Sequence, residues 1–276
     1  SAASDVYKRQ LYHSKFSLQI FIYYDRIHLG DNMFKNYIFD LYGTLIDINT
    51  DEWSDDLWEK MALFYSYKGA KYTGKEFHKE YNRLCKEEKA RIKAVHPEYK
   101  NNVDIKIEKV FKELFNLKNV EVTDEEVLNV CAIFRCYSTK YVKLYDGVID
   151  LLDTLKAKGK KIFLLSNAQR SFTMNEMNML GLTPYFDGIF ISSDREVSKP
   201  HPCFYNGLIE EYGLDKKECV MIGNDYKADI NGSKRAGIKS LYIHQSISPE
   251  IKGKVNTPYQ IMDGNVSVSY THLTLP

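Results

Sequence analysis

The sequence has few of the features that mark secreted, membrane-bound or nucleic-acid-binding proteins. The net charge is only +1 over 276 residues, whereas nucleic acids and anionic membranes attract a concentrated positive field. The five cysteines are odd in number and scattered, which favours reduced thiols over a disulfide framework. Cys131 and Cys136 lack a second pair at the spacing that zinc sites show. We therefore expect a cytoplasmic protein that binds neither nucleic acid nor membrane.

A membrane-spanning segment and an export signal are also lacking. The stretch FSLQIFIYYDRIHL, residues 16–29, is too short and too polar to span a bilayer, and it has no small-residue cleavage site. The two ends of the chain, residues 1–32 and 266–276, fit no structural element and resemble translated adaptor sequence. We expect both ends to be non-native extensions, with Met33 as the natural start.

The region from residue 50 to residue 142 shows the pattern of helices and no strand. TGKE, starting at Thr73, and TDEE, starting at Thr123, are capping boxes that each open a long helix with one apolar face. Aromatic residues recur through this region at positions that favour packing between helices. The sequence predicts a helical insert, or cap, of about four helices at residues 50–142.

Residues 33–49 and 143–265 have the alternating pattern of an α/β domain. The run KIFLLSN is continuously apolar, which is typical of a parallel strand buried on both faces. It follows GVIDLLDTLKAKG, whose apolar residues recur at helical spacing up to Gly159. Further strands are predicted at YIFD, GIFIS, CVMIGND and SLYIH. This alternation predicts a doubly wound, Rossmann-like parallel sheet, interrupted after its first strand by the helical cap.

Polar residues stand where the apolar runs of the predicted sheet end, and ligands bind at that edge of such sheets. They are Asp40 with Thr44, Ser166 with Asn167, Lys199, and Asp225 with Asp229. Asp225 and Asp229, four residues apart, offer oxygen ligands for Mg²⁺, which proteins usually hold with one or two carboxylates, waters and substrate phosphate. Transfer of a phosphoryl group needs positive charge around it and a positioned attacking oxygen. Lys199 supplies the positive charge and Asp40 the attacking oxygen.

In these segments the sequence resembles the haloacid dehalogenase-like hydrolase superfamily, in the subgroup with a helical cap inserted after the first strand. DLYGTL is similar to its first motif, LLSN to the second, SKPHPCFY to the third and GNDYKADINGSKRAG to the fourth. The motifs occur in the family order and the resemblance covers residues 35–245. It implies an α/β hydrolase core with a cap that closes over the site and selects the substrate.

The resemblance also implies the roles of the catalytic and substrate-binding residues. Asp40 would attack the substrate and become a covalent aspartyl ester that water later hydrolyses. Thr44, Ser166 and Asn167 would bind the transferring group. Lys199 would neutralise its charge and position Asp40.

The metal site implied by the resemblance holds Mg²⁺. Its ligands would be Asp40, the backbone carbonyl of Tyr42 and Asp225, with Asp229 helping to hold the site. Tyr42 departs from the phosphatase pattern, which has a second aspartate there as general acid and base. General acid–base help is worth about 10²–10⁴-fold, and a tyrosine with an ordinary pKa near about 10 is a poor base at neutral pH.

Three functions therefore stay open. The acidic fourth motif favours a Mg²⁺-dependent phosphatase acting on a small phosphorylated metabolite. The DLYGTL form of the first motif is familiar in L-2-haloacid dehalogenases, which need no metal and whose halide leaving group needs no proton. Arg83, Arg91 or Arg135 of the cap would then supply the halide contact. The third function is that of a weakly active binding protein.

Two features are predicted to have no chemical role. The run KEEKARIK, residues 86–93, is expected to be a solvated helix face with charge pairs four residues apart. His201 is expected to be an ordinary loop residue.

Overall fold

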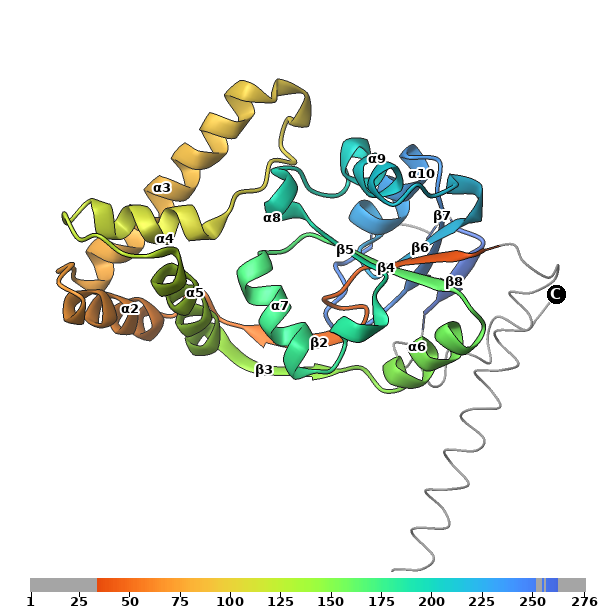
Figure 1. Ribbon diagram of the computed structural model, residues 1–276, viewed down its shortest axis with the longest axis horizontal. Coiled ribbons are helices and arrows are strands. Elements are labelled where there is room, and N and C mark those ends of the chain that lie inside the picture. Colours follow the sequence, from red (N-terminus) through yellow and green to blue (C-terminus); the bar gives the residue numbers. More distant parts are fainter. Residues whose placement is uncertain (1–33, 252–254, 256, 263–276) are drawn as a thin grey trace, which may run out of the picture.

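A parallel sheet of six strands forms the centre of the α/β core in the computed structural model, which describes residues 34–251, 255 and 257–262 (Figure 1). The predicted extensions at residues 1–32 and 266–276 lie outside these residues. The strand order is β5-β4-β1-β6-β7-β8, and every pairing is parallel. The strands are β5 (Gly188–Ile191), β4 (Lys161–Ser166), β1 (Asn36–Phe39), β6 (Cys219–Gly223), β7 (Lys239–Ile243) and β8 (Tyr259–Ile261). The predicted doubly wound fold is confirmed, and β8 extends it beyond the predicted strands.

Both faces of the sheet are covered, as the continuous apolar runs predict. Tyr37 and Phe39 of β1 pack into one hydrophobic cluster, whereas Ile38 between them packs into another on the opposite face. Helix α6 lies over the first face and α9 and α10 over the second (Figure 1). The helices of the core are α6 (Val148–Ala157), α7 (Arg170–Met179), α8 (Ser192–Arg195), α9 (Pro202–Glu211) and α10 (Gly232–Arg235), with short turns η2 (Thr183–Tyr185), η3 (Lys216–Glu218) and η4 (Tyr226–Asn231).

Four helices form the cap, as predicted. They are α2 (Asp55–Tyr67), α3 (Gly74–Val95), α4 (Ile107–Asn116) and α5 (Asp124–Ser138), with the short turn η1 (Pro97–Tyr99) after α3. Thr123 and Glu126 form the full capping box at the start of α5, whereas at α3 only the Thr73 hydroxyl caps the helix. The cap has its own aromatic core, in which Tyr65 stacks on Phe115. None of the helices in the described residues is long and apolar enough to cross a membrane.

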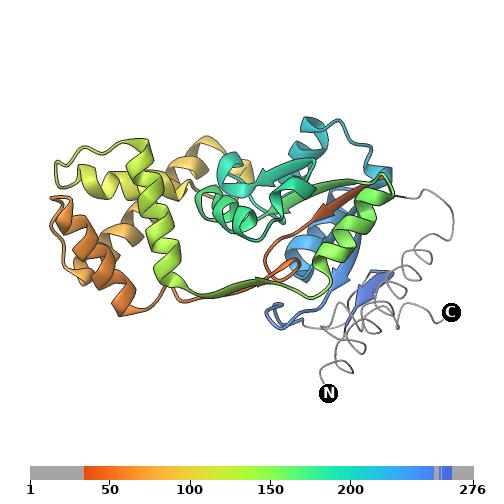
Figure 2. The ribbon, with the colours of Figure 1, turned by 60° about the horizontal axis from the view of Figure 1, so that its bottom comes forward.

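A two-stranded antiparallel ribbon joins the cap to the core. Its strands are β2 (Ile46–Thr50) and β3 (Thr139–Leu144), and Figure 2 shows them running side by side between the two parts. The prediction that residues 50–142 contain no strand is therefore wrong at the end of this region. Much of the ribbon is exposed, and β3 contains only exposed and half-buried residues. It consequently lacks the continuous apolar run that marks the strands of the main sheet.

Candidate active site

Asp40 stands at the carboxyl end of β1 and begins a tight loop. Its backbone N–H continues the pairing with β6 by donating to the carbonyl of Ile222 at 2.9 Å. The chain then turns back, and the Leu41 carbonyl accepts the N–H groups of three following residues. Gly43 has a φ of +80°, and a Cβ there would lie 2.2 Å from Nδ2 of Asn224. Only glycine fits this turn, so the first motif is shaped by the packing of its loop against the end of β6.

Lys199 lies between two carboxylates and links the third motif to the first and the fourth. Its Nζ donates to Asp40 at 2.6 Å and to Asp229 at 2.8 Å, and the residue is only 4% exposed. Burial alone would lower the pKa of Lys199, but Asp229 and Asp40 outweigh it and the pKa is raised. Burial raises the pKa of Asp229, against the opposing effect of Lys199. The ammonium group therefore stays charged and compensates the negative charge of the two buried carboxylates.

The loop that carries Lys199 is fixed by Asn167 at the end of β4. The Asn167 side chain accepts the Lys199 backbone N–H at 2.7 Å and donates to the Lys199 carbonyl at 2.9 Å. Both ends of the amide are thus bonded to backbone. The sequence predicts that Asn167 binds the transferring group. Because the Asn167 side chain is bonded to the Lys199 backbone and orients that lysine, Asn167 would have to bind the group through its own backbone N–H.

Two hydroxyl groups lie at the predicted substrate positions. Thr44 Oγ1 is 3.2 Å from Asp40 Oδ2 and 3.3 Å from Asn224 Oδ1. Ser166 is fully buried at the end of β4, and its hydroxyl has no hydrogen-bond partner among the described residues. Buried hydroxyls are normally bonded, so the Ser166 group is suited to bond a ligand.

The fourth motif forms a turn that presents one free carboxylate oxygen. Asp225 Oδ1 accepts the N–H groups of Lys227 and Ala228, each at 2.8 Å, and so caps η4. Asp225 Oδ2 takes part in none of the hydrogen bonds of the described residues. Asp229 is different, because its two oxygens accept from Lys199 and from the Asp225 N–H. Both oxygens of Asp229 are thus already bonded, which places Asp229 to support the turn.

This set of oxygens fits Mg²⁺. The described residues contain no cluster of three histidine, cysteine or acidic side chains that would hold a metal by themselves. Mg²⁺ does not need one, since one or two carboxylates, waters and substrate oxygens usually complete its shell. Asp40 and Asp225 are the two carboxylates available, and the predicted third ligand is the Tyr42 carbonyl.

Tyr42 does not take the place of a general acid. Its hydroxyl donates to Glu176 on α7 in a short hydrogen bond and contacts Thr173 Oγ1 at 3.1 Å. Burial, followed by the charge of Glu176, raises the pKa of Tyr42 far above its ordinary value. Glu176 is held in turn by Arg135 Nε of α5 at 2.6 Å. The Tyr42 hydroxyl is thus bonded to a carboxylate that a cap arginine also binds.

We expect Tyr42→Phe to change turnover by less than about threefold, because the raised pKa of the Tyr42 hydroxyl and its bond to Glu176 make it a poor general acid and base near neutral pH. The free energy of unfolding should fall by about 1–3 kcal/mol, since buried Glu176 loses a donor. Steady-state kinetics and urea denaturation measure the two effects. Tyr141→Phe is the matched control, because that hydroxyl bonds Asp47 on the ribbon, at 3.2 Å. A hundredfold loss of turnover at unchanged stability would restore Tyr42 as a proton carrier.

Two residues near the nucleophile are not among those that the sequence predicts. Asn224 directly precedes Asp225. Its position just after β6 is the feature that could have identified it as a site residue. Glu176 lies inside an amphipathic helix, where a glutamate gives no signal of burial. Of the three cap arginines considered, Arg135 lies over Tyr42. Its guanidinium carbon is 5.6 Å from the centre of the Tyr42 ring. Arg83 pairs with glutamates of its own helix.

The chain is similar to known proteins in both sequence and fold. A family model described as haloacid dehalogenase-like hydrolase matches residues 34–237. Pyrimidine 5'-nucleotidase PynA of Streptococcus pneumoniae is 29% identical over 110 residues, which are 40% of this chain and 46% of that protein. Pyrophosphatase PpaX of Halalkalibacterium halodurans is 31% identical over 130 residues, 46% of this chain and 60% of that protein. The matched part therefore spans about half the length of these curated relatives.

A solved structure has the same fold at low sequence identity. The 2-haloacid dehalogenase from Pseudomonas syringae pv. tomato DC3000 superposes with a TM-score of 0.54 at 19% identity, covering 85% of this chain and 96% of that one. This likeness extends over both the sheet and the cap. The likeness establishes the fold alone, so the chemistry has to be inferred from the residues of the site.

Proposed function

Because the chain belongs to the haloacid dehalogenase-like hydrolase family, we propose that it is a Mg²⁺-dependent phosphatase of a small phosphorylated metabolite, acting in the cytoplasm. The observation that carries the proposal is the buried ion cluster, in which Lys199 joins Asp40 to Asp229. A third carboxylate, Asp225, stands beside it with one free oxygen, and its backbone N–H donates to Asp229. A phosphoryl group brings the negative charge that such a site stabilises.

The residues divide the reaction between them. An Asp40 oxygen attacks phosphorus, the bond from phosphorus to the leaving oxygen breaks, and an aspartyl phosphate remains on the protein. Water then attacks the same phosphorus, the bond to Asp40 breaks, and inorganic phosphate leaves. Lys199, Thr44 and Ser166 hold the phosphoryl oxygens through both steps. Bound Mg²⁺ supplies positive charge that offsets the charge of the phosphoryl group.

A leaving group of low basicity suits this site, because Tyr42 supplies no proton. p-Nitrophenyl phosphate is therefore a sensitive probe, and an alkyl phosphate should turn over more slowly, by a factor within the 10²–10⁴-fold range typical of acid–base help. Relatives matched by sequence are named as a pyrimidine 5'-nucleotidase, a pyrophosphatase and two phosphatases, which supports phosphoryl transfer.

The second candidate is hydrolysis of a 2-haloacid through an aspartyl ester on Asp40 without metal. Tyr42 favours it, since expulsion of halide needs no acid. Asp225 opposes it, because a carboxylate with a free oxygen has no part in a metal-free reaction.

The test is a paired assay of phosphate release from p-nitrophenyl phosphate and chloride release from 2-chloropropionate, each with Mg²⁺ and with a chelator. We expect phosphate release that falls about 100-fold on chelation and returns with Mg²⁺, since the metal supplies several kcal/mol of charge stabilisation. Chloride release without metal would establish the dehalogenase instead. Release of neither ion, with ligand affinity unchanged in Asp40→Asn, would leave a binding protein.

A further inference from the structure

The cap touches the core at a further place, besides the β2–β3 ribbon and the packing of α5 against α7. The segment between η1 and α4 passes close to α8 (Figure 1) and pairs with the loop that follows it. Val103 lies opposite Val197 in an antiparallel bridge. On either side of it, the Ser198 N–H donates to the Asn102 carbonyl at 2.8 Å, and the Asp104 N–H donates to the Glu196 carbonyl at 3.2 Å. We call this contact, residues 102–104 with residues 196–198, the cap clamp.

The side chain of Asp104 fastens the cap clamp to two further parts of the core. Its Oδ2 accepts from Ser192 Oγ, at the end of β5, at 2.5 Å. Its Oδ1 accepts from Gln169 Nε2, before α7, at 3.3 Å, and from the Ile105 N–H at 2.8 Å. Gln169 Oε1 accepts the N–H of Ile107 at 2.9 Å and so reaches the first residue of α4. The carboxylate is therefore the point at which three segments meet.

Burial raises the pKa of Asp104, because the carboxylate is moved away from water. Hydrogen bonds from Ser192, Ile105 and Gln169 oppose this effect, and the nearby charge of Lys89 does so too. A buried carboxylate costs free energy unless it is bonded. The hydrogen bonds that Asp104 accepts where the cap meets the core offset this cost.

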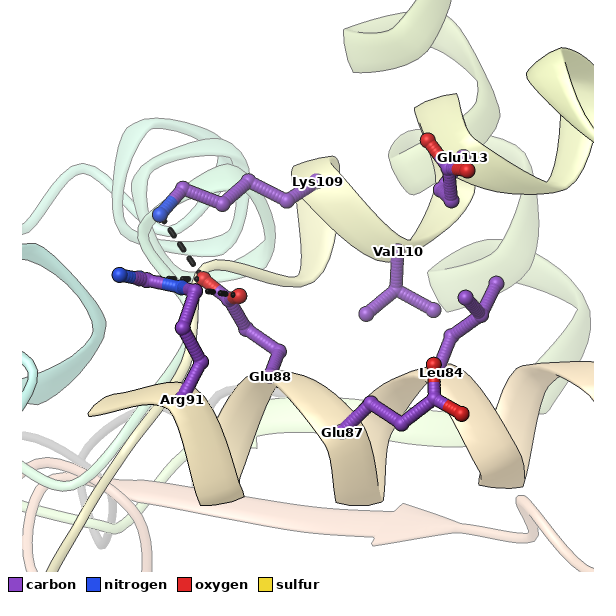
Figure 3. A pocket seen from close by; sticks show the side chains of 7 residues that line it. All are labelled: Leu84, Glu87, Glu88, Arg91, Lys109, Val110 and Glu113. Atoms are coloured by element: carbon purple, nitrogen blue, oxygen red, sulfur yellow. Dashed lines mark hydrogen bonds and ion pairs between the residues drawn. The ribbon is translucent and has the colours of Figure 1, made fainter. Parts of the chain in front are cut away.

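Charged residues of α3 and α4 flank the cap clamp. Figure 3 shows Glu88 held by Arg91 and Lys109 beside a groove of about 390 Å³ between the two helices. The same two cations lie 3.3 and 3.5 Å from Glu196 of the core. The predicted solvated face at residues 86–93 thus includes one residue, Arg91, that reaches the core. These pairs are exposed and contribute little by themselves.

The cap clamp ends at the catalytic lysine. Residues 196–198 lead directly into Lys199, whose backbone is held on its other side by Asn167. The loop is therefore fixed between the cap and the core. A misplacement of about 1 Å in such a site costs as much as 10²-fold in rate.

We propose that Asp104 is a positioning residue, which joins the cap to residues 196–198 and thereby holds Lys199 in its place beside Asp40. The effect on turnover rests on the proposed phosphatase function, whereas the effect on the loop does not.

The test compares Asp104→Ala with Asp104→Asn in the full chain. Alanine removes every acceptor, whereas asparagine keeps Oδ1 for Gln169 and Ile105 and turns its amide toward Ser192 Oγ. Asp56→Ala is the control, because Asp56 is an exposed cap residue paired only with Lys60 of its own helix. Hydrogen–deuterium exchange of the backbone amides of Ser198 and Lys199 reports on the loop. The kinetic constants for p-nitrophenyl phosphate report on the site.

We expect Asp104→Ala to raise exchange at Ser198 and Lys199 at least about tenfold, in line with the loss of charged hydrogen bonds. The kcat should fall about tenfold while KM stays within about twofold, since Lys199 acts on the reacting group. Asp104→Asn should restore both values to within about threefold of the wild type. If Asp104→Ala does not fold, Ser192→Ala removes the partner hydroxyl and should move both readouts in the same direction.

Each outcome has one meaning. Unchanged exchange in folded Asp104→Ala overturns the inference while leaving the phosphatase standing. Raised exchange with unchanged kcat overturns the positioning role, because the contact would then serve stability alone. A wild type that releases no phosphate defeats the proposed function, and exchange at the Lys199 amide still decides whether Asp104 holds the loop.

Discussion

Asp40→Asn is expected to lower phosphate release by about 10⁴-fold or more, the largest effect of any substitution in this chain. An amide is a poor nucleophile, so the first bond to phosphorus does not form. Asparagine keeps the shape of the side chain, and its one oxygen still accepts from Lys199, while its amide nitrogen faces the Thr44 hydroxyl. Initial rates measure the loss. Mass spectrometry of the peptide that contains residue 40 should find a phosphorylated species in the wild type and none in the variant.

Asp47→Asn is the matched control for this experiment. Asp47 is also a buried aspartate close in sequence, but it pairs with Lys143 and Tyr141 on the ribbon. Its replacement should leave kcat within about threefold of the wild type, since the partners of Asp47 belong to the ribbon and not to the site. More than a tenth of wild-type turnover in Asp40→Asn would show that the attacking oxygen is another group.

Lys199→Met is expected to lower kcat by about 10³-fold and the free energy of unfolding by about 3–5 kcal/mol. Both effects have one cause. Methionine fills a similar volume but leaves the carboxylates of Asp40 and Asp229 buried without a cation. Steady-state kinetics and urea denaturation measure the two losses. Lys35→Met, which removes an exposed pair with Glu218, should cost about 1 kcal/mol or less and serves as the control.

The stability loss in Lys199→Met should depend on pH. Burial raises the pKa of Asp229 in the folded state, and removal of the ammonium group raises it further. A carboxyl group whose folded pKa exceeds its unfolded pKa favours folding at low pH, and this contribution is lost as pH rises through the folded value. The penalty should therefore be smaller near about pH 5 than near about pH 8. An equal penalty at both values would mean that Asp229 is not the group left uncompensated.

The sequence predicts the main sheet well because its strands are buried on both faces. A run such as that of β4 has no polar face, so its composition alone marks it as a strand. The polar residue that ends each run then marks the catalytic edge. Asp40 and Ser166 are found in this way, as is Asp225 beyond β6.

The contacts between cap and core leave no comparable mark. Asp104 and Ser192 are 88 residues apart, and each is an ordinary loop or helix-end residue by local pattern. Glu176 and Arg135 likewise look like solvated helix residues until α5 and α7 meet. The two-stranded ribbon is only partly buried and carries polar residues throughout, so it lacks an apolar run. These features depend on which segments the fold brings together, and a single chain of letters does not encode that locally.

The ribbon has a consequence for exchanging one cap for another. Its first strand, β2, begins six residues after Asp40, while residues 102–104 of the cap hold the loop of Lys199 from the opposite side. A chimera that grafts a foreign helical domain onto residues 50 and 139 would restore the first tether and lose the second. Such a graft would have a new substrate selectivity, but the loop of Lys199 would no longer be held on the cap side. Transplanting the short stretch around Asp104 together with the graft is what would let the donor domain work on this sheet.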